Sequence, residues 1–526
     1  MRRNVESLFF TLAFLALTQS VAMADTDGEH LLRSPNIIIM MADDMGMGDT
    51  NAYQDWTGNA DADQVKTPNM QRLAKMGIRF TDAHSPSSRC TATRQALLTG
   101  RYTWRTRLKY SVIWGPQGAP LIEPARPTIA SWLRAKGYHT GMTGKWHCGL
   151  TYRNSAGDPE PDYEKVDLTK GIADGPVNHG FDFFHGTSRS HKTSAPQGWL
   201  EGDRVLAAVG GTKVDRSKFV LTEIGPINYA KAKQFLTEHV ESKEHQSKPF
   251  FLYYACNSNH TPHTVCKHIE GVPVKGVSHP GGKRSDYIYQ NDVALGLLMK
   301  QLEQTADPRR DGKPLIENTI LIFTSDNGAE NRSKTATGPL RSNKGSMYEG
   351  GHRVPFIATW KLGGIGDGND FTNGKTSDSP VSLVDIFGML AAVTESELPA
   401  EGAEDTFDIL PAFKGETLAG RPPLIHNDHN EGAKRAGKKA NDPSAAWMAI
   451  RLDNPIVDGK LYEGKWKLLV DEKLLLVGKS NPRELYNLAV DLKEQVNLIE
   501  KEEMQPLINF LIKEIQNIHD RGRIRK

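Results

Sequence analysis

Four short apolar segments, separated by long polar stretches, constrain the fold of this chain more than any other feature. They are Asn36–Ala42, Pro249–Ala255, Thr319–Thr324 and Pro355–Trp360. Continuous apolar segments of this length are typical of strands buried on both faces of a sheet. Further segments predict a strand at 138–143 and helices at 68–76, 128–136, 287–304 and 382–393. This alternation predicts an α/β fold, in which a large mixed, mostly parallel sheet is sandwiched by helices.

The pattern changes near Gly415, and a turn-rich link follows at 420–423. Beyond it, alternating segments predict an antiparallel sheet and an amphipathic helix closes the chain; they are Ala446–Arg451, Gly464–Val470, Lys473–Val477 and Lys501–His519. We therefore expect a larger domain over 25–417 and a smaller C-terminal α+β domain over 418–526. Two polar segments, 152–174 and 427–443, are expected to be loops.

The first 24 residues have the layout of a secretory signal. A basic start, Arg2-Arg3, precedes the apolar segment Leu8–Leu17, and small residues flank Met23 before the expected cleavage after Ala24. The alternative is a buried N-terminal helix. The apolar segment is too short for a permanent anchor, so we expect a secreted or periplasmic protein without a stable membrane anchor. With 65 Lys+Arg against 63 Asp+Glu, the net charge of +2 gives no reason to expect nucleic acid as a partner.

Acidic residues follow two of the predicted strands. Asp43 and Asp44 come directly after the first, and Asp326 and Asn327 come after the segment Thr319–Thr324. Open α/β sheets place their ligands at the carboxyl ends of strands, and adjacent carboxylates repel each other unless a cation lies between them. An all-oxygen ligand set favours Ca²⁺, with Mg²⁺ as the alternative, over zinc.

The segment Cys90-Thr91-Ala92-Thr93-Arg94, followed by Thr99-Gly100, resembles the signature of the type I sulfatase family, and specifically its arylsulfatase-A-like members. These enzymes have the alkaline phosphatase superfamily fold. In the family this cysteine is oxidised after translation to formylglycine, so the resemblance implies the same for Cys90, which would also contact the metal. Ala92 stands where many members have proline. We therefore expect a formylglycine-generating maturation enzyme that tolerates alanine and acts before or during export.

Further segments resemble the family in the expected order, over nearly the whole mature chain. They are Gly144–Gly149, Ser190-His191, Phe251–Ala255 with His260 and Pro262, Lys344-Gly345 with 348–353, and Glu484–Leu488 with Asp491 and Asn497-Leu498. The C-terminal match is to the usual ending of the second domain. The resemblance assigns the catalytic domain to 25–417.

The resemblance implies a role for each matched residue. The hydrated aldehyde attacks sulfur, and removal of a proton from its second hydroxyl later expels sulfate. Arg94 hydrogen-bonds the modified side chain, and Lys145 supplies positive charge for the anionic ester. His147 is the expected base, whereas His260 and Lys344 bind the sulfate and protonate the leaving oxygen. Substrate binding is expected from Lys145, His260, Lys344, Ser190 and His191; the role of His263 stays open.

The expected activity is hydrolysis of sulfate esters, on small molecules or sulfated oligosaccharides. One alternative is a phosphate mono- or diesterase of the same superfamily, which would generally use two zinc ions and a Ser or Thr nucleophile. The other alternative is an inactive secreted protein that binds sulfated glycans.

The four cysteines are too few for a disulfide scaffold in a chain of 526 residues. Cys256 and Cys266 could form one disulfide in an oxidising compartment or remain two free thiols. Cys148 is unusual within its motif and directly follows His147.

Overall fold

The structure is a computed structural model that describes residues 31–109, 111–114, 119–190, 196–330, 333, 335–429, 446–472, 478 and 481–525. The expected signal segment, the strand expected at Lys473–Val477, His191 and most of the loop expected at 427–443 lie outside these residues.

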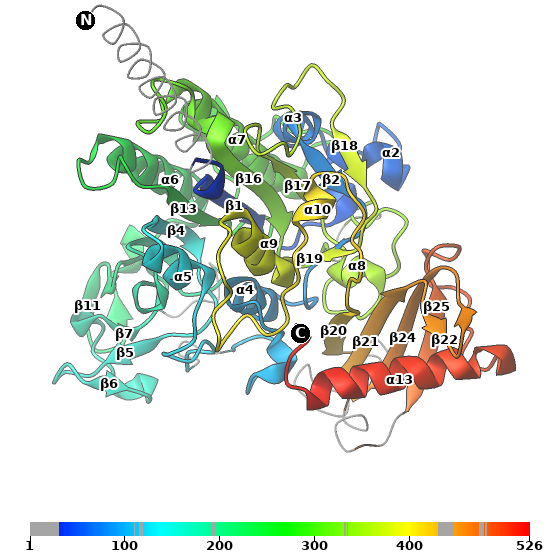
Figure 1. Cartoon of the computed structure of the whole chain (residues 1–526). Helices are drawn as coiled ribbons and strands as arrows, with labels where there is room; N and C mark the ends of the chain where they lie inside the picture. The colour runs from blue at the N-terminus through cyan, green and yellow to red at the C-terminus, as the bar shows by residue number, and fades with distance from the viewer. Residues whose placement is uncertain are drawn as a thin grey trace, which may run out of the picture.

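Within this part of the chain, ten strands form the main sheet (Figure 1). Their order is β10 (Arg204–Val205), β9 (Leu200–Glu201), β8 (Phe183–Thr187), β4 (His139–Lys145), β13 (Phe250–Ala255), β1 (Asn36–Ala42), β16 (Thr319–Ser325), β17 (Phe356–Thr359), β2 (Ile78–Phe80) and β18 (Lys375–Ser377). The central strands from β8 to β16 are all parallel, whereas β9, β10 and β17 pair antiparallel with their neighbours. The mixed, mostly parallel sheet predicted from the apolar segments is therefore confirmed.

Strand β1 explains why the sheet needs helices on both faces. Its residues alternate between two separate cores, with Ile37, Ile39 and Met41 on one side and Ile38 and Met40 on the other. The first face is covered by α4 (Cys90–Thr99), α5 (Ile129–Ala135), α9 (Ile386–Val393) and α10 (Leu410–Phe413). The second face is covered by α3 (Pro68–Met76), α6 (Ile224–Glu241) and α7 (Lys283–Gln304).

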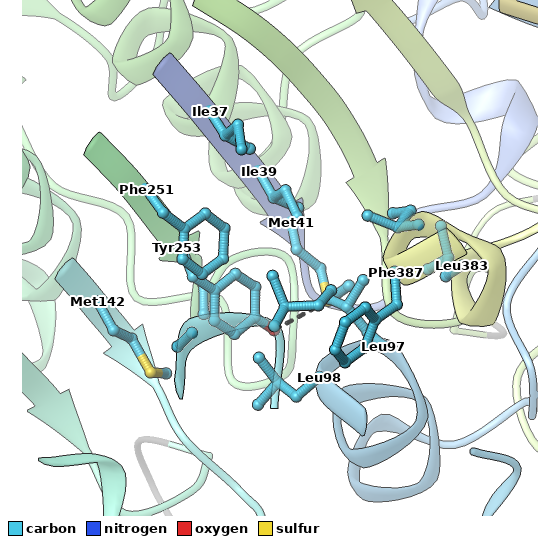
Figure 2. Packing of buried hydrophobic residues seen from close by; sticks show 14 of the residues in the cluster. Ile37, Ile39, Met41, Leu97, Leu98, Met142, Phe251, Tyr253, Leu383 and Phe387 are labelled. Atoms are coloured by element: carbon cyan, nitrogen blue, oxygen red, sulfur yellow. Dashed lines mark hydrogen bonds between the residues drawn. The ribbon is translucent and has the colours of Figure 1, made fainter. Parts of the chain in front are cut away.

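Helix α4 packs directly on the centre of the sheet. Figure 2 shows Met41 of β1, Phe251 and Tyr253 of β13 and Leu97 and Leu98 of α4 in one buried cluster. The Tyr253 hydroxyl contacts Met41 Sδ at 3.3 Å within this cluster. Ten buried residues in a row make α4 a core helix, which fixes the position of its first residue, Cys90.

The C-terminal region forms a second, antiparallel sheet (Figure 1). Its strands are β20 (Leu424–His429), β21 (Ala446–Asp453), β24 (Lys465–Asp471) and β25 (Pro482–Asn487). Helix α13 (Gln505–Asp520) packs its apolar stripe on one face of this sheet. The predicted antiparallel sheet with a closing helix is confirmed, while the domain boundary at 417/418 stays a prediction.

The prediction of a loop over 152–174 was wrong. Strands β5 (Thr151–Arg153), β6 (Pro159–Glu160) and β7 (Ile172–Asp174) form a small antiparallel sheet there. Tyr152 and Ile172 are buried in the main core, which anchors the segment although its apolar residues are too scattered to show a period.

The remaining described elements are short. They are α2 (Gln54–Thr57), α8 (Glu349–His352), β3 (Ala83–His84), β11 (Ala208–Gly210), β12 (Lys213–Val214), β14 (His268–Ile269), β15 (Val272–Pro273), β19 (Val381–Ser382), β22 (Ile456–Val457) and β23 (Lys460–Leu461). All four cysteines are free and buried, so Cys256 and Cys266 are separate thiols here. Among the described residues, no helix combines the length and the apolar character that crossing a bilayer requires.

Candidate active site

The candidate site lies at the carboxyl edge of the central parallel strands. Strand β1 ends just before Asp43 and Asp44, and β16 ends just before Asp326. Strand β4 ends at Lys145, and β13 leads into the loop that carries His260. Because these strands are parallel neighbours, the segments that follow them meet at one edge of the sheet.

An acidic cluster forms the base of the site. Ligand atoms of Asp43, Cys90 and Asp326 all lie within 4.8 Å of one another, and all three residues are buried. Burial, together with the charge of Asp43, raises the pKa of Asp326 to about 6. Asp44 belongs to the same cluster, because its backbone N–H donates to Asp326 Oδ1 at 3.2 Å.

The cluster has free oxygen atoms suited to a cation. Oδ1 of Asp43 and Oδ1 of Asn327 are buried and have no hydrogen-bond partner among the described residues. The amide nitrogen of Asn327 donates to Asp44 Oδ1 at 2.8 Å, which leaves its oxygen directed elsewhere. Unpaired buried carboxylate and amide oxygens are costly unless a cation or donor meets them, so the residues fit a hard divalent ion.

Three cationic side chains surround the acidic cluster. Lys145 Nζ donates to Asp43 Oδ2 at 2.6 Å, and Lys344 Nζ donates to Asp44 Oδ1. Arg94 donates to Asp326 Oδ2 from both Nε (3.0 Å) and a terminal nitrogen (2.7 Å). Burial alone would lower the pKa of Lys344, but the charges of Asp44 and the neighbouring anionic groups together outweigh it and raise that pKa above its usual value. The lysine therefore stays protonated.

Helix α4 fixes Cys90 and Arg94 relative to each other. The helix starts at Cys90 after the extended residue Arg89, and it ends at Gly100, whose φ of 62° suits glycine. Arg94 lies one turn beyond Cys90, and its guanidinium also donates to the Lys145 carbonyl at 3.1 Å. Burial raises the pKa of the Cys90 thiol, although Lys145 and Lys344 oppose this effect.

Both expected catalytic histidines lie close to these cations, His147 buried and His260 partly buried. Burial, with the charges of Lys145 and Arg94, holds the pKa of His147 well below its usual value, and its Nδ1 has no partner within the described chain. Burial lowers the pKa of His260 to about 4. Its Nδ1 lies 2.6 Å from the Thr261 carbonyl, and its Nε2 lies 4.0 Å from Asp44 Oδ2. Both rings are therefore neutral imidazoles at neutral pH.

Other predicted residues are less closely tied to this site. Ser190 is buried beyond the end of β8, and His191 lies outside the described residues. His263 pairs with Glu330 at 2.8 Å. Cys148 is fully buried in the core, which raises its thiol pKa to about 12.

Three residues around the site were not predicted from the sequence motifs. Asn259 directs its amide nitrogen to the Asp44 carbonyl (3.5 Å) and has a buried, unpartnered oxygen. Arg89 and Asp428 form an ion pair beside Cys90, at 3.2 Å. Asn259 and Arg89 directly precede His260 and Cys90 in the sequence, so inspection of the residues flanking each motif would have found them. Nothing in the sequence marks Asp428.

The model of the sulfatase family matches residues 35–396, which include all the site segments described above except Asp428. The chain belongs to the sulfatase family. It is 31% identical to human arylsulfatase A over 77% of this chain and 73% of that protein. It is 28% identical to N-acetylgalactosamine-6-O-sulfatase of Bacteroides thetaiotaomicron, over 86% of this chain and 92% of that protein.

Solved structures agree with this assignment. A structure from work on glycosaminoglycan metabolism by Bacteroides thetaiotaomicron has 25% sequence identity and a TM-score of 0.70. The match covers 93% of this chain and all (100%) of that one. The protein is thus a sulfatase enzyme, with the fold that its resemblance implied.

Proposed function

We propose that this sulfatase hydrolyses sulfate esters of carbohydrates through Cys90 matured to formylglycine, with a divalent cation held by Asp43, Asp44, Asp326 and Asn327. One observation carries the proposal. The Cys90 Sγ and carboxylate oxygens of Asp43 and Asp326 lie within 4.8 Å of one another. Lys145, Arg94 and Lys344 pair directly with this acidic cluster.

Formylglycine and the cation have distinct tasks. Formylglycine supplies a hydrated aldehyde, whose hydroxyl is the nucleophile and whose second hydroxyl allows sulfate to leave. The cation supplies charge that favours the ionised nucleophile; Ca²⁺ suits the irregular all-oxygen set better than Mg²⁺. The rest of the chemistry falls to side chains that the structure places around Cys90.

The lysines and Arg94 hold the charge of the sulfate group. A buried cation interacts more strongly with an anion than a solvated one, so Lys145 and Lys344 stabilise the charge that develops on the transferred group. Arg94 is fixed by Asp326 and the Lys145 carbonyl, and it keeps the nucleophile oriented. His147 is a neutral imidazole with an unpartnered Nδ1, as a general base must be.

Proton donation to the leaving oxygen is better suited to Lys344 than to His260. In a neutral His260 the only ring proton is on Nδ1, which faces the Thr261 carbonyl at 2.6 Å. Its Nε2 is then an acceptor. Lys344 carries a proton because the surrounding carboxylates raise its pKa. His260 then binds and orients the sulfate together with Lys145, while Ser190 and His191 contact the substrate.

Carbohydrate sulfates are the proposed substrate class. The N-acetylgalactosamine-6-O-sulfatase relative is aligned over 92% of its length, and the structural match comes from work on glycosaminoglycan metabolism. The N-terminal segment with the layout of a secretory signal supports secretion or a periplasmic location, where polymeric glycans are accessible.

Mass spectrometry of the Cys90 peptide tests the proposal, combined with turnover of paired aryl sulfate and aryl phosphate. The matured protein should contain an aldehyde in place of the thiol, hydrolyse methylumbelliferyl sulfate in preference to the phosphate, and contain calcium. Cys90→Ala should abolish turnover. An active protein whose Cys90 is an unmodified thiol would falsify the mechanism. A panel of sulfated saccharides then identifies the sugar.

A further inference from the structure

We propose that Arg89 binds a second oxyanion of the substrate, so that the enzyme prefers sulfate esters that carry another sulfate or a carboxylate close to the scissile group. The inference rests on the proposed function, because it concerns the surroundings of the scissile sulfate. Arg89 directly precedes Cys90 and is not part of the family signature, which starts at the cysteine. Arg89 is therefore not among the residues to which the signature assigns the shared chemistry.

The guanidinium of Arg89 lies close to Lys344, one of the cationic residues proposed to bind the sulfate group. A Cβ placed on Gly345 would lie 2.5 Å from a terminal nitrogen of Arg89, so the guanidinium packs closely against the backbone of Gly345. Gly345 also donates its N–H to the Ser88 carbonyl at 3.1 Å. Because Gly345 follows Lys344, which pairs with Asp44, the guanidinium is next to the residue proposed to contact the leaving oxygen.

A buried carboxylate of the C-terminal sheet holds Arg89 in this position. Asp428, on β20, accepts from Arg89 Nε at 3.2 and 3.3 Å and also accepts from the Ser88 hydroxyl. The Asp428 side chain is fully buried, whereas 19% of the Arg89 side chain is exposed. The charge of Asp428 raises the pKa of Arg89 further, with smaller contributions from Cys90 and Asp44. The guanidinium is therefore charged and oriented, and it belongs to a side chain that is partly exposed.

The geometry of this ion pair leaves the terminal nitrogens of the guanidinium out of the contact with Asp428. Asp428 engages only Nε, and the two terminal nitrogens donate to no other group in the described part of the chain. An arginine that serves only to tie two segments together would use its paired nitrogens. Instead, four N–H donors remain in a planar fork, which matches the two oxygens of a carboxylate or sulfate. A neutral hydroxyl would satisfy few of them.

The test compares substrates that differ only in a second anion. Phenyl sulfate, ortho- and meta-carboxyphenyl sulfate and the phenylene bis(sulfates) are assayed with matured wild-type enzyme, Arg89→Gln, Arg89→Lys and Asp428→Asn. The ratio of variant to wild-type kcat/KM is compared between substrates, so differences in leaving group cancel. For at least one dianionic ester, Arg89→Gln should lower this ratio by at least about tenfold more than for phenyl sulfate. Arg89→Lys should restore part of the loss.

The controls separate binding from folding. Asp428→Asn should reduce the same selectivity, because it releases the guanidinium without removing it, and Arg204→Gln, on an exposed arginine of β10, should change nothing. The thermal melting of each variant shows whether it is folded. Preference for the bis(sulfates) identifies sulfate as the second anion, and preference for the carboxyphenyl esters identifies a carboxylate.

Two failures have different meanings. Equal ratios for all the esters, in folded variants, overturn the role of Arg89 and leave the proposed function standing. If matured wild-type enzyme hydrolyses neither the aryl sulfates nor the panel of sulfated saccharides, the proposed function itself fails.

Discussion

Nζ of Lys145 lies 2.6 Å from Oδ2 of Asp43, and both side chains are fully buried. The other oxygen of Asp43, Oδ1, has no partner among the described residues. One carboxylate thus connects the cationic pocket proposed for sulfate to the oxygen cluster proposed for the metal. A charge at either site changes the electrostatic potential at the other, because buried groups are poorly screened by solvent.

Removal of the cation should destabilise the protein through Asp43. After chelation, added Ca²⁺ should raise the melting temperature, because a ligand that binds only the folded state stabilises it. Asp43→Asn should weaken Ca²⁺ binding by about 100-fold or more. Asp405→Asn is a matched control, because Asp405 is equally buried but pairs with Arg105, away from the cluster. A Ca²⁺ response in Asp43→Asn equal to that of wild type would contradict this assignment.

Lys145→Met should lower kcat/KM for methylumbelliferyl sulfate by about 100- to 1,000-fold, the usual effect of losing one preorganised charge-stabilising group. The same variant should not bind Ca²⁺ more weakly, because Asp43 then loses only a competing cation. Kinetics and calcium titration of one protein sample measure both effects. Reduced Ca²⁺ affinity together with unchanged turnover would assign Lys145 to the metal site instead.

The meeting of Asp43, Asp44 and Asp326 was predictable from sequence, because both acidic segments directly follow buried strands of a parallel sheet, whereas Cys90 and Lys344 do not follow such a strand. The periods and lengths of β1, β13 and β16 indicate those strands, and their carboxyl ends share one edge. The catalytic roles of these residues stay predictions. The pair of Arg89 and Asp428 was not predictable, since 339 residues separate them and only tertiary packing joins them.

The C-terminal sheet is attached to the main domain through buried charges that local sequence patterns also do not reveal. Lys467 of β24 donates to Glu349 at 3.0 Å and to Glu494 at 2.8 Å, and all three side chains are fully buried or nearly so. Lys467→Met should lower the free energy of unfolding by about 3–5 kcal/mol, because it removes the cation that both buried carboxylates share, while Glu349 retains its ion pair with Arg353.

Lys361→Met is the matched control for Lys467→Met. Lys361 pairs with Glu317 at 2.8 Å, but its side chain is 52% exposed, so the loss should be no more than about 1 kcal/mol. Thermal and denaturant unfolding compare the two variants. Equal destabilisation by both would show that the buried network contributes no more than a surface pair.

Three buried histidines lie next to the network of Lys467, Glu349 and Glu494. From them we expect the protein to lose stability in acid. His84, His352 and His426 lie together, and burial lowers the pKa of each below its usual value of 6.5. Asp82, Glu349, Arg451 and Lys467 are the charged groups that face them. Just below pH 6.5, only the unfolded chain binds protons at these three histidines. Their contribution to the free energy of unfolding is therefore fully present above that pH and decreases as the pH falls.

Glu494 acts in the opposite direction. Burial raises the pKa of Glu494 to about 7. Its contribution to the free energy of unfolding is therefore fully present at low pH and is lost as the pH rises through that value. Together with the histidines, this carboxyl predicts a stability maximum close to neutral pH.

His426→Asn isolates the histidine effect, because neither ring nitrogen of His426 has a hydrogen-bond partner among the described residues. Between pH 6.5 and 5 the variant should lose stability more slowly than wild type, by up to about 1.4 kcal/mol per pH unit, the linkage of one proton. Melting temperatures across this range give the slope. His268→Asn, on an exposed histidine of β14, should leave the slope unchanged. The same slope in His426→Asn and wild type would mean that His426 already binds a proton in the folded protein.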